Sequence, residues 1–177
     1  INVGQLLYEK IKLSGIQLQY RLAGTSCAIN GFQFMFADGK ISGSGGITTG
    51  HGAPQGSLKL NISGLMLQNA IEFNEKIRNR IFGLVNGKAA IDFELSRKIL
   101  DTAKGSVEFT IDKGKLVDTG IQNGLGLLLS ELKYKLRDLE FNKIYGNIDI
   151  RGTNYLINSF IFNSNNVRLK ITGNFNK

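Results

Sequence analysis

The chain has 177 residues, 42% of them hydrophobic, which is enough for one domain with its own hydrophobic core. Lys and Arg outnumber Asp and Glu by 22 to 14, but the charges alternate with apolar residues along the chain, so they favour a soluble surface over a dedicated anion-binding face. A single His and a single Cys exclude an ordinary zinc site and an intrachain disulfide.

Alternation of apolar and polar residues dominates the chain and predicts half-buried antiparallel strands. The strands that we expect cover residues 16–22, 28–36, 39–48, 57–63, 89–95, 106–112, 146–151, 155–162 and 167–175. We expect hairpin turns at residues 37–39 and 112–114, because each ends in a glycine that can adopt a positive φ. Residues 48–56 contain the only proline and are expected to form an exposed loop.

Two segments switch from the strand period to the helical period. Apolar residues recur at steps of three and four over residues 66–81 and again over residues 121–136. Each segment is predicted to form an amphipathic helix that caps or plugs the apolar face of the sheet. Core packing is the simplest role for both helices, with membrane or partner contact as the alternative.

A near-duplicate pair of segments indicates an internal repeat. Residues 22–34 and 150–162 align without a gap at a separation of 128 positions. The identical pairs are Gly24/Gly152, Thr25/Thr153, Ile29/Ile157, Asn30/Asn158, Phe32/Phe160 and Phe34/Phe162. The repeat extends over residues 11–47 and 139–175, and it predicts a mainly β domain spanning residues 1–177, built as an extended antiparallel sheet from reused strand units.

Residues suited to catalysis are sparse. Asp92 with Glu94 and Glu108 with Asp112 could lie on one face of a strand, as acid-base chemistry requires, but they also alternate with apolar residues as a solvated face does. A serine nucleophile would depend on His51, which lies in the glycine-rich loop. We therefore expect no enzyme activity, no metal and no cofactor. The aromatic residues fall on the apolar face, so nucleic acid is not expected as a partner.

The region from residue 87 onward has a more specific pattern. A strand-turn-strand at residues 105–116 precedes the leucine-rich segment at 121–136, and the chain closes with strands at 146–150, 158–162 and 167–173. This order resembles the C-terminal region of the AsmA-like family, the AsmA/TamB-type envelope proteins of Gram-negative bacteria. The resemblance covers residues 83–177, and residues 11–64 are similar to its closing half.

The resemblance implies a curved sheet whose apolar groove shelters phospholipid acyl chains in transit between the inner and outer membranes. It also implies a periplasmic location, attachment to the inner membrane through a segment absent from this chain, and contact with membrane surfaces or envelope proteins. The expected groove lining comprises Leu58, Leu60, Ile62, Ile91, Phe93, Val107, Phe109, Ile111, Ile148, Ile150, Leu169 and Ile171.

Three other hypotheses remain open from the sequence. One is a nucleic-acid binder, which the net charge of +8 alone permits and which salt-dependent binding to duplex DNA would favour. The apolar face could be fully packed by the helices, in which case the protein would be a non-enzymatic scaffold for outer-membrane integrity or protein assembly. A polysaccharide-cleaving enzyme built on a repetitive β fold is the more remote hypothesis, because no acid cluster has an Arg or His nearby.

Overall fold

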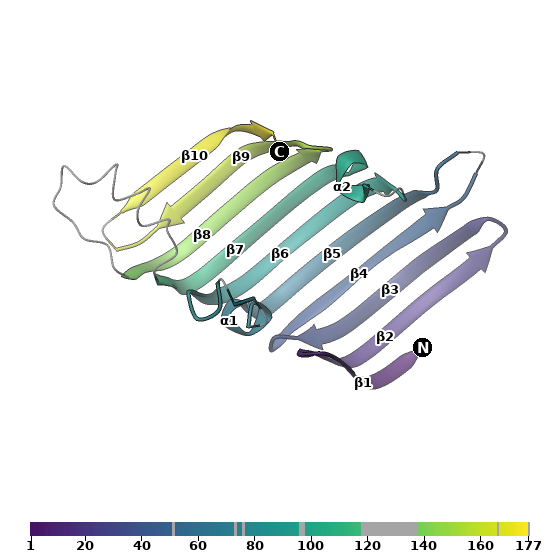
Figure 1. Ribbon diagram of the computed structural model, residues 1–177, viewed down its shortest axis with the longest axis horizontal. Coiled ribbons are helices and arrows are strands. Elements are labelled where there is room, and N and C mark those ends of the chain that lie inside the picture. The colour runs from purple at the N-terminus through teal and green to yellow at the C-terminus, as the bar shows by residue number, and fades with distance from the viewer. Residues whose placement is uncertain are drawn as a thin grey trace.

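The computed structural model describes residues 1–50, 52–72, 74–75, 77–95, 98–117, 138–165 and 167–176, with the side chain of Asp138 excepted. These residues form one ten-stranded antiparallel sheet in which every strand pairs with its neighbours in the chain (Figure 1). The strands are β1 (Asn2–Tyr8), β2 (Ile11–Ala23), β3 (Ser26–Phe36), β4 (Gly39–Thr48), β5 (Gln55–Met66), β6 (Ile81–Glu94), β7 (Lys104–Val117), β8 (Asp138–Arg151), β9 (Asn154–Asn163) and β10 (Arg168–Asn176). The expected mainly β fold with a curved antiparallel sheet is confirmed.

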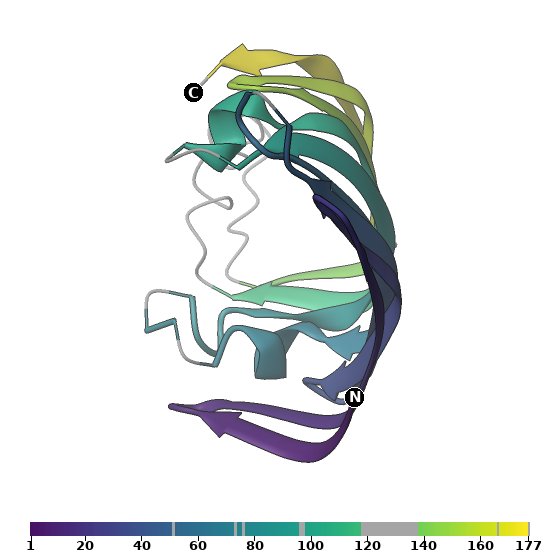
Figure 2. The same cartoon turned by 90° about the vertical axis from the view of Figure 1, so that its right-hand side faces the viewer.

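The strands bend along their length, so the sheet has a concave and a convex side (Figure 2). Breaks in the pairing register promote this bending, because an extra residue on one strand increases its local bend and twist. In β2 the register shifts between Ser14 and Gln17, and in β5 it shifts between Ile62 and Leu65. Gly15 and Gly64 lie within these two breaks with φ values of 59° and 66°, a conformation that favours glycine.

The helical predictions need correction. Residues 66–81 do not form one helix: α1 covers only Leu67–Ala70, and Ile81 already begins β6. The described apolar residues at steps of three and four there are divided among a strand end, a short helix, a turn and a strand start. A second short helix that the sequence did not predict, α2 (Ile99–Thr102), connects β6 to β7. The segment 121–136 lies outside the described residues. Helices α1 and α2 lie on the concave side at opposite ends of the strands (Figure 2).

The two predicted glycine turns also differ from expectation. Residues 37–39 do connect β3 to β4, but Ala37 and Asp38 carry the positive φ, at 49° and 61°, and the buried Gly39 begins the next strand. Residues 112–114 are not a hairpin turn, because β7 continues through them to Val117. Lys113 has a φ of 48° there, so the glycine at position 114 accompanies an irregularity inside β7 and does not mark a turn.

The internal repeat corresponds to two three-stranded units, β2–β4 and β8–β10. Gly24 lies in the turn between β2 and β3 with a φ of 55°, and Gly152 lies in the equivalent turn between β8 and β9 with a φ of 63°. Among the described strands, β1 is the one that the sequence pattern did not predict, and it pairs with β2 from Asn2 to Tyr8.

Burial in this sheet is shallow. Among the described residues seven hydrophobic side chains are buried, and no large side chain falls below 2% exposure. The described part of the chain is therefore a single layer with an incompletely covered apolar face.

Candidate functional site

The pairing register places the apolar residues of successive strands on one face. Directly paired residues in an antiparallel sheet point to the same side. Leu60 of β5 pairs with Ala89 of β6, Ala89 pairs with Val107 of β7, and Val107 pairs with Ile148 of β8. This row of apolar side chains crosses the sheet at right angles to the strands.

Parallel rows bring the rest of the predicted lining onto the same face. Leu58 pairs with Ile91, and Phe93, two residues further along β6, also faces that side. The remaining predicted residues lie on the same face because each pairs directly with an apolar residue or a glycine of that face. These pairs are Ile62 with Gly87, Phe109 with Gly87 and Gly146, Ile150 with Gly105, Ile111 with Ile144, Leu169 with Phe162, and Ile171 with Phe160. All twelve predicted lining residues thus share one face. The structure contains no acyl chain, so their role as a lining stays a prediction.

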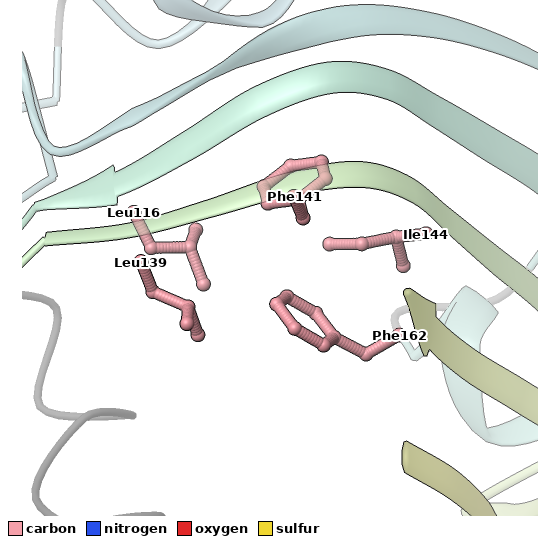
Figure 3. Packing of buried hydrophobic residues seen from close by; sticks show 5 residues of the cluster. All are labelled: Leu116, Leu139, Phe141, Ile144 and Phe162. Carbon is pink, nitrogen blue, oxygen red and sulfur yellow. The ribbon is translucent and has the colours of Figure 1, made fainter. Parts of the chain in front are cut away.

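Sequence reasoning missed the best-buried part of this face. Five residues of β7, β8 and β9 form a cluster on the inner side of the curved strands (Figure 3), namely Leu116, Leu139, Phe141, Ile144 and Phe162. The rings of Phe141 and Phe162 are 5.6 Å apart, and their side chains are 4% and 5% exposed. The sequence signal that could have revealed this cluster is the spacing of the apolar residues in 139–144. The step of three from Phe141 to Ile144 breaks the strand period of two and conceals that these residues share a face.

Among the described residues, the apolar face is buried at this cluster and at Leu65 of β5, and it is more exposed elsewhere. Leu58, Leu60 and Val107, near the middle of the sheet, are only half-buried. Exposure rises toward the outer strands, reaching 42% at Ile171 in β10 and 68% at Leu22 in β2. One portion of the face therefore behaves as a packed core, while the rest keeps apolar side chains within reach of solvent.

Aromatic rings fill the places where glycine leaves a gap on the apolar face. The ring of Phe32 lies against Gly43, and the ring of Phe109 lies against Gly146. Side chains on a concave face crowd together, so pairing a large ring with a glycine relieves the crowding and preserves the curvature. Glycine therefore interrupts the apolar pattern in the sequence without interrupting the apolar face.

The opposite face is polar and carries the charges. Lys88 pairs with Glu108 at 3.0 Å, and Lys143 lies 3.8 Å from Asp112. An open depression of about 440 Å³ lies across this polar face, lined by Lys59, Lys88, Glu108 and Asn147 among others. Its lysine stems and amides are exposed, as on a solvated sheet surface.

The candidate chemical groups that the structure describes do not assemble into a site. Glu108 and Asp112 each contact a lysine, as solvated carboxylates do. Within the described ranges no three His, Cys, Asp or Glu side chains come together as metal ligands would. Cys27 is a half-buried free thiol in β3, and His51 lies outside the described residues.

The fold and the site define a class of protein: a single-layer, curved antiparallel sheet with one apolar and one polar face. Comparison of the chain with protein-family models, with curated proteins and with solved structures finds no match. None of the helices in the described parts of the chain has the length and apolar character needed to cross a membrane.

Proposed function

We propose that the apolar face shelters acyl chains and that the protein carries phospholipid between the two membranes of a Gram-negative envelope. The observation that supports this proposal is the continuous apolar face, which crosses the ten described strands and whose described residues are for the most part only partly buried. Each methylene group removed from water contributes about 0.8 kcal/mol, so an apolar surface of this extent lowers the barrier for an acyl chain without any chemical step.

The polar face fits the same function. A lipid carrier in water must expose one hydrated surface, and the ladder from Asn61 through Lys88 and Glu108 to Asn147 provides it. Charged headgroups would stay in water at the margins of the apolar face. The periplasmic location, the inner-membrane attachment and the contacts with membrane surfaces or envelope proteins belong to this proposal and derive from the AsmA-like resemblance.

A fluorescent fatty acid titrated into delipidated protein tests the proposal. Val107 and Ser106 are neighbours in β7 whose side chains point to opposite faces, so Val107→Glu and Ser106→Glu are matched variants. We expect Val107→Glu to weaken binding at least about tenfold, because it places a carboxylate on the apolar face, and Ser106→Glu to leave binding unchanged.

A second pair of variants distinguishes a loss of fatty-acid binding from a loss of folding. Ile171 in the edge strand β10 is 42% exposed, so Ile171→Glu disturbs packing less than a change at Val107 does. Lys170→Glu is its control on the other face. Delipidated wild-type protein that is folded by circular dichroism and binds no fatty acid would contradict the proposal.

A scaffold function is the second candidate, and the packed cluster around Phe141 and Phe162 favours it. A scaffold needs the apolar face only for stability. In that case Val107→Glu would lower the melting temperature, and neither the variant nor the wild type would bind fatty acid. The two functions therefore give opposite results in the same titration.

A further inference from the structure

A cavity of about 550 Å³ opens where β2 separates from β3, at the end of the strands that carries α1. The pairing of β2 with β3 ends at Ser14 and Met35. Strand β2 stays paired with β1 as far as Ile11, and β3 stays paired with β4 as far as Phe36. The end of the β1–β2 hairpin therefore stands apart from the rest of the sheet, with α1 across the cavity from it (Figure 2).

The two walls of this cavity carry charges of opposite sign. Lys10 and Lys12 line one wall, which is formed by β2 and the turn before it. Asp38 and Glu72 line the other wall, in the β3–β4 turn and shortly after α1. Asn69 of α1 donates a hydrogen bond of 2.7 Å to the Asp38 carboxylate, which ties α1 to that turn. Within the described part of the chain, these lysines form no ion pair with these carboxylates, so the gap keeps apart charges that attract each other.

An apolar residue connects the cavity to the apolar face. Phe36 is one of the residues that line the cavity. Phe34, two residues earlier in β3, pairs with Ile41, and Ile41 pairs with Ile62 of the predicted groove lining. Because alternate residues of a strand share a face, Phe36 lies on the apolar face as well. A molecule held between the charged walls is therefore positioned to extend an acyl chain onto the apolar face.

We propose that this cavity binds a phospholipid headgroup that carries both a phosphate and a primary ammonium, as in the phosphatidylethanolamine class, an inference that rests on the proposed function. The two lysines donate to the phosphate, and the ammonium N–H groups donate to the two carboxylates. A purely anionic headgroup leaves those carboxylates unpaired beside its own negative charge. The opposite charges of the two walls therefore favour a headgroup with both charges.

The same walls distinguish a primary from a quaternary ammonium. A quaternary ammonium has no N–H group to donate to a carboxylate, and proteins recognise it with cages of aromatic rings. Among the described residues that line the cavity, Phe36 alone is aromatic. Asp38 and Glu72 instead offer the oxygen acceptors that a primary ammonium needs. An ethanolamine headgroup is accordingly preferred over a choline headgroup.

Titration of delipidated protein with dihexanoyl phosphatidylethanolamine and dihexanoyl phosphatidylcholine, whose acyl chains are identical, tests this proposal. We expect the ethanolamine lipid to bind at least about tenfold more tightly. Glu72→Lys should abolish this preference. Glu75→Lys makes the same change at an exposed position of the same segment, outside the cavity lining, and should retain the preference. Both variants should bind the fluorescent fatty acid as the wild type does, which shows that they are folded.

A variant of the basic wall tests the phosphate contact. Both lipids carry the phosphate, so Lys12→Gln should weaken the binding of both by a similar factor. Lys40→Gln removes an exposed lysine that does not line the cavity and should weaken neither.

The outcomes separate this proposal from the proposed function. Fatty-acid binding by the wild type together with equal affinity for the two lipids overturns the headgroup site and leaves the proposed function in place. A preference that Glu72→Lys leaves intact has the same consequence. A folded wild type that binds neither fatty acid nor lipid overturns both. Equal affinity for glycerophosphoethanolamine, which has the headgroup without acyl chains, means that the cavity takes a free phosphate ester and overturns its assignment to a lipid.

Discussion

The ring of Phe141 in β8 covers the α-carbon of Gly114, its direct cross-strand partner in β7. A methyl group at Gly114 would overlap both this ring and the backbone carbonyl oxygen of Phe82. The buried cluster on the apolar face therefore depends on the absence of a side chain at position 114.

Gly114→Ala should destabilise the protein by about 1–3 kcal/mol, because the ring of Phe141 and the β6 backbone cannot both move aside. Gly31→Ala is the matched control, since nothing lies within 4 Å of a Cβ at Gly31. It should leave stability unchanged or raise it slightly. Urea denaturation of both variants measures the difference, and equal midpoints would contradict this view of the cluster.

The two hairpin turns of the internal repeat should respond differently to the same change. Gly24→Ala should cost about 1–2 kcal/mol from the left-handed backbone alone, because nothing else lies near a Cβ there. Gly152→Ala should cost more, since its Cβ would also approach the carbonyl oxygen of Asp101 at 2.5 Å. Thermal unfolding compares the two variants, and a larger loss for Gly24→Ala would show that the contact with Asp101 is unimportant.

The ion pair between Lys88 and Glu108 should contribute little to stability. Its side chains are 68% and 39% exposed, so water screens the attraction. Lys88→Ala should change the free energy of unfolding by less than about 0.5 kcal/mol, with a smaller change at high salt. A larger loss in urea denaturation would mean that the polar face has a structural role beyond solvation.

Photocrosslinking should distinguish the two faces of β5. A photoreactive residue at Leu58 should form adducts with lipid in cell extracts, whereas one at Lys59 should not, because adjacent side chains point to opposite faces. Mass spectrometry of the adducts provides the measurement. Lipid adducts from both positions at equal yield would count against selective binding on the apolar face.

The strands could be predicted well because their signal is local. A period of two over residues 57–63 or 106–112 indicates a strand with one apolar face, and the structure extends these strands to Gln55–Met66 and Lys104–Val117. The prediction of a helix failed where turns and a strand start contain apolar residues at helical spacing. Residues 66–81 have helical spacing, yet among the described residues of this segment only Leu67–Ala70 form a helix, and the other described ones belong to the end of β5, to turns and to the start of β6.

The glycines of the apolar face were harder to interpret from sequence. In β4, Gly43 and Gly45 interrupt the apolar alternation, although both lie on the apolar face opposite Leu60 and Leu58. Only the neighbouring strand shows why, since the ring of Phe32 occupies the space at Gly43. The packed cluster was missed for a related reason, because Lys113 shifts the alternation in β7.

The sequence by itself determined the strand character of the chain and which residues share a face, because the alternation of side chains is a property of each strand alone. The tertiary structure decided which strands are neighbours and, among the described residues, where the apolar face is packed and where it is more exposed. These properties depend on hydrogen bonds and side-chain contacts between residues far apart in the chain, and a pattern within one strand does not encode them.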